Sequence, residues 1–210
     1  MSIESFKVVL VGEMGVGKTS IITQFIDQTF LEDQQTTAGG TFSTKSVVCD
    51  GVKILKFEIW DTAGQEKYRS LTKMFFKDAN AAVMVYDITR KDSFEELKNY
   101  WTSQIKESSP ENIILAIAAN KSDLIEQEAV EEENARNFAK EINAIFVSTS
   151  AKDSEGINNL FKEIAKKYTG ASTITIKEDE DDDQPEEEQK NTVKIEAGNK
   201  AKKQKKSGFC

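Results

Sequence analysis

The chain has 210 residues, 38% of them hydrophobic and 30% charged, and its formal net charge of −8 argues against a general nucleic-acid-binding surface. It contains no histidine and only two cysteines, which excludes Ser-His and Cys-His catalytic pairs, four-cysteine metal sites and a disulfide framework. No apolar run approaches the roughly 18 residues that span a bilayer, and the acidic N-terminus is not a secretory signal, so we expect a cytosolic protein.

Residues 1–168 predict strands and helices in alternation. Continuous or alternating apolar residues indicate strands over 6–11, 41–49, 53–60, 81–86, 113–119 and 145–147. Asp50-Gly51 separates the second strand from the third and is a strong hairpin signal. Apolar residues at helical spacing indicate helices within 21–26, 94–105, 135–142 and 157–168, and we expect a further helix over 66–79.

This order predicts an α/β fold, with a six-stranded, mostly parallel sheet, one antiparallel edge strand and five helices packed against it. Ligands of such sheets bind at the carboxyl ends of the strands, near the point where the strand order reverses. Residues 169–210 contain an acidic run at 178–183, a lysine-rich end at 200–206 and few large apolar side chains. We therefore expect a globular domain over 1–168 and a disordered tail over 169–210.

The first strand leads into the string GEMGVGKT at residues 12–19, which matches the phosphate-binding pattern GxxxxGK[ST] between a strand and a helix. Its glycines allow backbone N–H groups to point into one concavity, to which the helix adds its positive dipole end. Lys18 can reach the outer phosphates, and the Thr19 hydroxyl can bind Mg²⁺. An ordinary glycine-rich turn is the alternative. The residues expected at the phosphates are Gly15, Val16, Gly17, Lys18, Thr19 and Ser20.

The third strand ends in a second polar string, WDTAGQE at residues 60–66. Asp61 stands where a strand-end carboxylate would hold Mg²⁺. Gly64 has no side chain, so its N–H can approach a γ-phosphate, and the Gln65 amide can both donate to and accept from an attacking water. A polar turn between a strand and a helix is the alternative. Beside the phosphate loop, the string favours hydrolysis of a nucleoside triphosphate.

Two later loops favour guanine as the base. In NKSD at residues 120–123, the Asp123 carboxylate can accept from the two adjacent N–H donors on the Watson–Crick edge of guanine, which adenine lacks. A backbone N–H in SAK at residues 150–152 can donate to guanine O6. Each string alone is typical of a solvated loop, but both follow strands at the expected ligand edge. The residues expected at the base are Asn120, Lys121, Asp123, Ser150, Ala151 and Lys152.

These motifs and their order, with TTAGG at 36–40 between the first two, resemble the small monomeric GTPases of the Ras superfamily over residues 5–168. The strings KFEIWDTAGQEKY at 56–68 and YDIT at 86–89 are similar to the Rab branch, and the details are most similar to endosomal Rabs. The resemblance implies the P-loop NTPase fold of small GTPases. It also implies GTP and GDP as ligands, Mg²⁺ as cofactor, and slow GTP hydrolysis that times vesicle and endosomal traffic.

The resemblance assigns roles that local patterns leave open. Thr37 aligns with the threonine that closes over Mg²⁺ and the γ-phosphate, with Thr36 as the alternative one residue away. Phe30 matches an aromatic that packs against guanine. The alternative is that Phe30 closes the end of the first helix. Effector contact is implied for Phe42, Trp60 and Phe75, which could equally be core or sheet residues. Catalysis is implied for Lys18, Thr37, Gly64 and Gln65, and Mg²⁺ binding for Thr19, Thr37 and Asp61.

Three positions depart from the family pattern. Met14 replaces a small residue and can crowd the catalytic water or the arginine finger of a GTPase-activating protein (GAP). Ala38 replaces a larger aliphatic residue, and the chain ends in one cysteine rather than a pair. Met14 leaves open a second hypothesis, a module that binds nucleotide but hardly hydrolyses it. A phosphate-loop ATPase is the third.

The similarity to Rabs implies geranylgeranylation of Cys210, the last residue. One lipid chain gives marginal membrane binding, so the lysines of 200–206 are expected to add attraction to an anionic leaflet. A free thiol on a solvated tail is the alternative. We therefore expect a monomer, peripheral on the cytosolic face of endosomal membranes. Its expected partners are an exchange factor (GEF), a GAP, a dissociation inhibitor (GDI) or escort protein, and effectors, with no nucleic acid.

Overall fold

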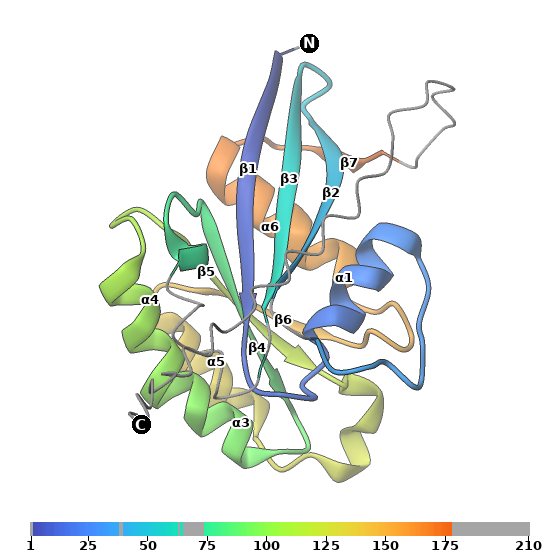
Figure 1. Ribbon diagram of the computed structural model, residues 1–210, viewed down its shortest axis with the longest axis vertical. Helices are drawn as coiled ribbons and strands as arrows, with labels where there is room; N and C mark the ends of the chain where they lie inside the picture. Colours follow the sequence, from blue (N-terminus) through green and yellow to red (C-terminus); the bar gives the residue numbers. More distant parts are fainter. Residues whose placement is uncertain (1, 38–39, 63, 65–73, 178–210) are drawn as a thin grey trace, which may run out of the picture.

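The computed structural model describes residues 2–37, 40–62, 64 and 74–177. Within them, helices cover both faces of a seven-stranded sheet with the order β6-β5-β4-β1-β3-β2-β7 (Figure 1). The strands are β1 (Ser2–Val11), β2 (Gly40–Cys49), β3 (Lys53–Thr62), β4 (Ala81–Asp87), β5 (Ile114–Asn120), β6 (Ile145–Thr149) and β7 (Ile174–Ile176). The helices are α1 (Lys18–Asp27), α3 (Lys91–Glu96), the π-helical η2 (Leu97–Trp101), α4 (Thr102–Ser108), the 3₁₀-helical η3 (Ser122–Gln127), α5 (Glu132–Glu141) and α6 (Ile157–Thr169).

The sheet is parallel except at one side. β1 pairs in parallel with β3 and with β4, and β4, β5 and β6 continue in parallel. β2 runs antiparallel to β3, and β7 runs antiparallel to β2. Because β3 and β4 lie on opposite sides of β1, the strand order reverses at β1. The loop after β1 therefore lies where sheets of this type bind ligands.

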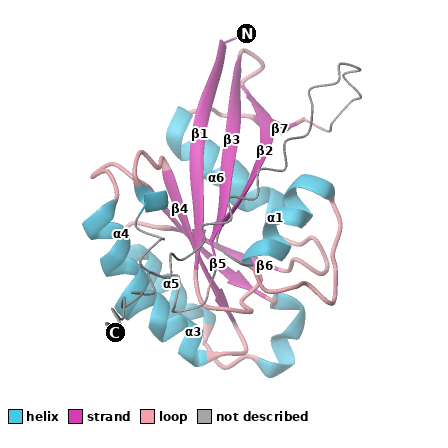
Figure 2. Cartoon of the chain, viewed as in Figure 1, coloured by secondary structure: helices cyan, strands magenta, loops and turns pink. Residues whose placement is uncertain are grey.

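The central strands of the sheet are packed on both faces, as their continuous apolar runs predicted. Phe6, Val8 and Leu10 of β1 pack in one cluster with side chains of α1 and α6. Val9 and Val11 pack in a second cluster with side chains from α3 to α5. Neighbouring residues of a strand point to opposite faces, so a strand buried on both sides needs apolar residues throughout. Figure 2 shows the two helical layers with the sheet between them.

The predicted helical stripes are confirmed. The stripe within 94–105 lies on α3, η2 and α4, which follow one another without a break, and its four side chains are buried. The stripe within 157–168 lies on α6, where the side chains up to Ala165 are buried and Tyr168 is partly exposed. Of the helix predicted over 66–79, residues 66–73 lie outside the described residues, 74–76 are helical and 77–79 are not.

The structure differs from the prediction at the start of the tail, because residues 174–176 add β7 as a seventh strand beyond β2. After α6, Gly170 adopts a positive φ of 70° and the chain turns back. The carboxylate of Asp50 accepts hydrogen bonds from the backbone N–H groups of Ser172 (3.2 Å) and Thr173 (2.7 Å). Local composition could not reveal this partner, which lies more than a hundred residues earlier. Residues 178–210, the rest of the predicted tail, lie outside the described residues.

We predict that Ile174→Ala lowers the free energy of unfolding by about 2–4 kcal/mol, because Ile174 is 6% exposed and packs with the core. Thr175→Ala, on the exposed side of β7, is the matched control and should change the free energy by less than about 0.5 kcal/mol. Urea unfolding followed by circular dichroism measures both. If Ile174→Ala changed the free energy of unfolding as little as Thr175→Ala, burial of Ile174 in β7 would not stabilise the domain.

Candidate functional site

The carboxyl ends of the strands border a cavity of about 600 Å³. Most residues expected to bind nucleotide line it, namely Gly15, Gly17, Lys18, Thr19, Ser20, Phe30, Thr37, Gly64, Asn120, Lys121, Asp123, Ala151 and Lys152. Three others lie behind its wall, since Val16, Asp61 and Ser150 are buried. The structure therefore brings the phosphate strings and the base strings of the sequence to one place.

The loop from β1 to α1 requires a glycine where it contacts residues 120–123, which we call the base loop. Gly17 has a φ of 98°, and a Cβ atom there would lie 2.2 Å from Nδ2 of Asn120. Any larger residue would push the two loops apart. α1 begins at Lys18, and no side chain of the described residues caps it. The first N–H groups of this helix are therefore left for an anion in the cavity.

Lys18 is buried beneath the loop that precedes it. Its Nζ donates hydrogen bonds to the carbonyl oxygens of Gly12 and Glu13, both at 2.8 Å, and its side chain is 5% exposed. Burial lowers the pKa of Lys18 to about 8, although the negative charges of Asp61 and Glu13 act in the opposite direction. An ammonium group in such a place attracts an anionic ligand strongly, because little water screens it.

Thr19, Thr37 and Asp61 converge beside Lys18. The Thr19 hydroxyl donates to Asp61 Oδ2 at 2.6 Å and lies 2.8 Å from the hydroxyl of Thr37, which also donates to Oδ2, at 3.2 Å. Thr36, the alternative to Thr37, is exposed. Within the described chain, Asp61 Oδ1 is buried without a hydrogen-bond partner, and burial raises the pKa of Asp61. A buried carboxylate with an unsatisfied oxygen, next to two hydroxyls, fits the oxygen ligands that Mg²⁺ prefers.

Asn120 ties the base loop to the phosphate loop. Its side chain is 1% exposed. Nδ2 donates to the carbonyl oxygen of Val16 at 2.8 Å, and Oδ1 accepts from the Thr149 hydroxyl at 3.2 Å. These contacts satisfy a buried amide from both sides and set the separation between the two ends of the cavity.

The Asp123 carboxylate is held at the cavity wall by the last strand-end loop. The Ser150 hydroxyl donates to Asp123 Oδ1 at 2.8 Å and accepts from the backbone N–H of Asp153 at 3.0 Å. Lys121 adopts a positive φ of 67°, and its Nζ lies 2.6 Å from Asp87 Oδ2. Asp123 and Ser150 therefore link NKSD to SAK, whereas Lys121 is held by Asp87.

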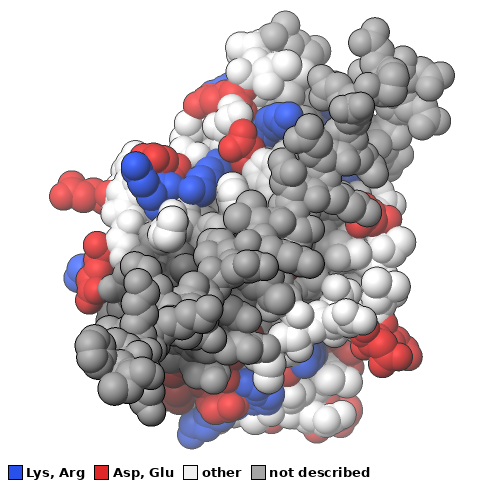
Figure 3. All heavy atoms as spheres, in the orientation of Figure 1, with Lys and Arg blue, Asp and Glu red and all other residues white. Residues whose placement is uncertain are grey.

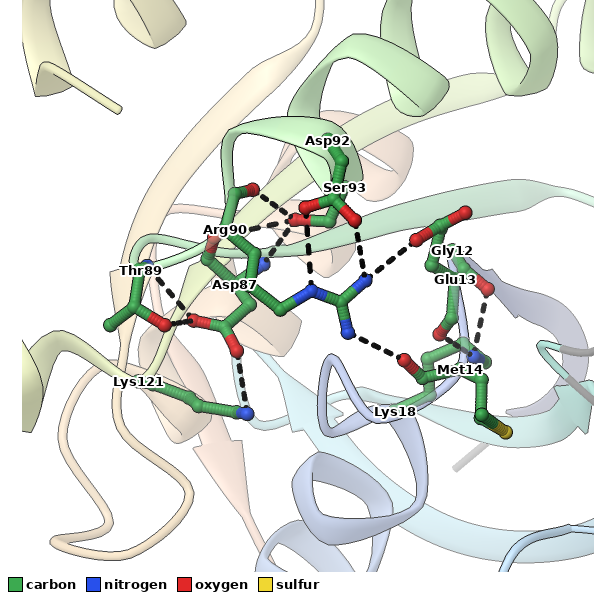
Figure 4. Close-up of polar contacts among 10 residues, drawn as sticks. All are labelled: Gly12, Glu13, Met14, Lys18, Asp87, Thr89, Arg90, Asp92, Ser93 and Lys121. Atoms are coloured by element: carbon green, nitrogen blue, oxygen red, sulfur yellow. Dashed lines mark hydrogen bonds and ion pairs between the residues drawn. The ribbon is translucent and has the colours of Figure 1, made fainter. Parts of the chain in front are cut away.

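Asp87, at the end of β4, was missed by the sequence analysis. It is 1% exposed, and besides pairing with Lys121 it accepts hydrogen bonds from the backbone N–H (2.9 Å) and the hydroxyl (2.7 Å) of Thr89 (Figure 4). Burial by itself raises the pKa of Asp87, but the hydrogen bonds from Lys121 and Thr89 outweigh it, and the pKa is lowered. The signal was available, since Asp87 directly follows an apolar run, as Asp61 and Asn120 do.

Three aromatic side chains predicted to contact effectors form a row outside the cavity. Phe42 of β2 lies 5.1 Å from Trp60 of β3, and Trp60 lies 5.3 Å from Phe75, measured between ring centroids. Phe42 is 49% exposed, while Trp60 and Phe75 are only partly buried. The row therefore runs from a half-exposed ring, Phe42, to two rings packed partly against the core, and its role as an effector surface stays a prediction.

Some predicted residues cannot be placed. Gln65, Ala38 and Cys210 lie outside the described residues. Met14 is described, and it lines the cavity with half of its side chain exposed. Leu124 also lines the cavity, which the sequence analysis did not anticipate.

Comparisons with known proteins find similar sequences over most of the chain. The family model of the Ras family matches residues 7–170. The human Ras-related protein Rab-22A is 44% identical over 167 residues, which cover 80% of this chain and 85% of the relative. The mouse Ras-related protein Rab-31 is 46% identical over 167 residues, with the same coverage of 80% and 85%. The dog Rab-22A is 44% identical over 171 residues, 81% of this chain and 87% of the relative.

We predict that the contribution of Lys18 to GDP binding decreases as the pH rises through about 8. The free protein loses the Lys18 proton there, whereas a bound phosphate favours the charged form, so binding becomes coupled to proton uptake. Calorimetric titration of the protein and of Lys18→Met, over about pH 7 to 10, gives the ratio of their affinities, in which titration of GDP cancels. The ratio should fall by up to about tenfold per pH unit above 8. A constant ratio would contradict the role given to Lys18.

Proposed function

The chain belongs to the Ras family and is a Rab-type small GTPase, which hydrolyses GTP and regulates endosomal traffic, and from this premise we propose which of its residues perform each step. One observation carries the assignment: a single cavity has the buried ammonium of Lys18 at one end and the anchored carboxylate of Asp123 at the other. A guanine nucleotide has the complementary pattern, with negative phosphates at one end and adjacent N–H donors on its base.

The phosphates of GTP and GDP are proposed to bind on the β1–α1 loop. Lys18 and the N–H groups of residues 15–20 would surround them, because a helix start and a glycine-rich loop present donors to the same anion. Phe30 lines the cavity and packs partly against the core, so its ring is supported where it would meet the base. Asn120, Lys121, Ala151 and Lys152 would enclose the base around Asp123.

Mg²⁺ is proposed to be held by Thr19, Thr37 and Asp61. The support is their convergence and the unsatisfied Oδ1 of Asp61. When bound, the ion would neutralise charge on the β- and γ-phosphates during hydrolysis. The role of the protein is to keep these three side chains together, and the hydrogen bonds among them already do so.

Hydrolysis and switching are proposed to involve Thr37, Gly64 and Gln65. A Cβ atom at Gly64 would lie 2.5 Å from the backbone nitrogen of Met14, so this glycine packs directly on the phosphate loop. Its N–H, with the Thr37 hydroxyl, would contact the γ-phosphate, and Gln65 would orient the attacking water. Loss of the γ-phosphate removes these contacts and releases both segments. Turnover without a GAP in this class is about 10⁻⁴ to 10⁻³ s⁻¹.

The aromatic row of Phe42, Trp60 and Phe75 is proposed as the effector surface. Trp60 and Asp61 are neighbours on β3 and point to opposite faces of the sheet. Asp61, a proposed Mg²⁺ ligand, is therefore adjacent in sequence to Trp60 of the proposed partner surface. GEF, GAP and GDI or escort proteins are the further partners that we propose.

Membrane association is proposed to be peripheral, through a lipid on Cys210. None of the helices in the described part of the chain is both long and apolar enough to cross a bilayer. On the face drawn in Figure 3, Lys and Arg side chains lie beside Asp and Glu side chains. We assign the attraction for anionic lipid to the lysines of 200–206.

Asp123→Asn should weaken GTP binding by at least about a hundredfold, because the acceptor for two N–H donors of guanine is lost. It should strengthen binding of xanthosine triphosphate, whose base offers an acceptor to the new amide. Competition against a fluorescent GDP analogue measures both. Asp153→Asn, an exposed neighbour, is the control and should change neither. Unchanged GTP affinity in Asp123→Asn would refute the base assignment.

Thr19→Val should make GDP release faster by about tenfold and much less sensitive to Mg²⁺, because it removes one proposed ligand while keeping the shape of the side chain. Release of the fluorescent analogue is followed with excess Mg²⁺ and with EDTA. Thr23→Val, one turn further along α1, serves as the control and should keep the full response to EDTA. If both variants respond to EDTA as the unmodified protein does, Thr19 is not a Mg²⁺ ligand.

A further inference from the structure

Arg90 belongs to neither the phosphate nor the base motif, yet its side chain reaches the phosphate loop (Figure 4). It immediately precedes α3. Its Nη1 donates to the carbonyl oxygen of Met14 at 2.9 Å, and its Nη2 donates to Glu13 Oε2 at 2.6 Å. One guanidinium thus binds two consecutive residues of a loop that lies 76 to 77 positions away in the sequence.

The turn that carries Arg90 is itself held firmly. The backbone N–H of Arg90 donates to the carbonyl oxygen of Asp87 at 3.0 Å, and the buried Ser93 hydroxyl donates to the carbonyl oxygen of Arg90 at 2.7 Å. The Asp92 carboxylate lies 3.4 Å from Nε and from Nη2. The guanidinium is therefore presented by an ordered turn, which reduces the entropy lost when it binds the loop.

The contact with the Met14 carbonyl also orients the N–H of the next residue, Gly15, because a trans peptide unit is planar. Its C=O and the N–H of the next residue point in opposite directions. When Arg90 holds the Met14 carbonyl on its own side, the N–H of Gly15 is directed away from Arg90. Gly15 lines the cavity, so this N–H is one of the donors of the proposed phosphate cradle.

The contact with Glu13 offsets a negative charge in the phosphate loop. Glu13 lies in the phosphate loop, and its carboxylate would repel a polyphosphate bound there. The two side chains are 34% (Arg90) and 25% (Glu13) exposed, so their ion pair is partly withdrawn from water. A short, charge-assisted hydrogen bond in that setting is stronger than an exposed pair. Arg90 thereby offsets the one acidic side chain of residues 12–19.

We propose that Arg90 is a positioning residue that holds residues 13–15 of the phosphate loop in the conformation that binds the β-phosphate. It acts through Met14 and Glu13 and does not itself touch the nucleotide. This inference rests on the proposed function, since it requires the cavity to bind GDP.

The test compares Arg90→Met with the unmodified protein. Methionine keeps an unbranched side chain but has no donor. Release of a fluorescent GDP analogue in excess Mg²⁺ should be about tenfold faster, and competition should show about tenfold weaker GDP binding, as expected when a charge-assisted hydrogen bond is lost. The affinity for GMP, which has no β-phosphate, should stay within about twofold. Arg90→Lys can donate to only one of the two partners at a time, and should fall between.

Arg136→Gln is the matched control. Arg136 of α5 also makes an ion pair with a glutamate, Glu132, but on the exposed surface of a helix. Its loss should leave the binding of both nucleotides unchanged. A double-mutant cycle of Glu13→Gln and Arg90→Met should give non-additive release rates, whereas a cycle of Glu132→Gln and Arg136→Gln should give no effect on release.

The outcomes separate the inference from the function on which it rests. Failure of the unmodified protein to bind GDP would remove the proposed function, whatever Arg90 does. If that protein binds GDP but Arg90→Met releases it at the same rate, the inference is wrong. Equal loss of GDP and GMP binding would also overturn it, because a general loosening of the fold predicts that result. If Arg90→Met does not fold, Arg90→Lys carries the same comparison of GDP with GMP.

Discussion

A buried ammonium group, bound by two carbonyl oxygens of its own loop, is the interaction on which the site depends. Lys18 Nζ is held by Gly12 and Glu13, and burial brings its pKa to about 8. A charge removed from water is costly unless other groups compensate it. The loop supplies part of that compensation, and an anion in the cavity would supply the rest. The glycines of its loop, the uncapped start of α1 and the cluster of Thr19, Thr37 and Asp61 all lie around this ammonium group.

The register of the sheet explains why the other functional side chains meet. Asp87 at the end of β4 lies beside Asn120 at the end of β5, which lies beside Thr149 at the end of β6. Leu10 near the end of β1 pairs with Asp61 of β3. The parallel register thus places the polar residues at the ends of β4, β5 and β6 in one row. This row includes Asn120, which lines the cavity of the proposed nucleotide site.

The loop after β4 contacts two other loops that line the cavity. Asp87 holds Lys121 of the base loop, and Arg90, three residues later, holds Met14 and Glu13 of the phosphate loop. A single turn therefore contacts both ends of the cavity. At the opposite end of the sheet, Asp50 holds the chain after α6 and adds β7 beside β2. In each case a carboxylate or guanidinium binds a distant part of the sequence, through backbone in the case of Asp50 and through a side chain in the case of Asp87.

The sequence by itself determined the α/β fold, the buried strands, the helical stripes and the motifs for guanine nucleotide, because periodicity and motif spacing are local properties. Asp61, Asn120 and Asp123 could be identified in this way, since each follows a strand at the ligand edge. Only the tertiary structure decided the roles of Asp87, Arg90 and Asp50, and the existence of β7. Besides local contacts, these residues have partners that lie between 34 and more than 120 positions away. Such contacts are made by packing between distant segments. The local pattern marks Asp87 as a polar residue at a strand end, but it does not identify Lys121 as its partner.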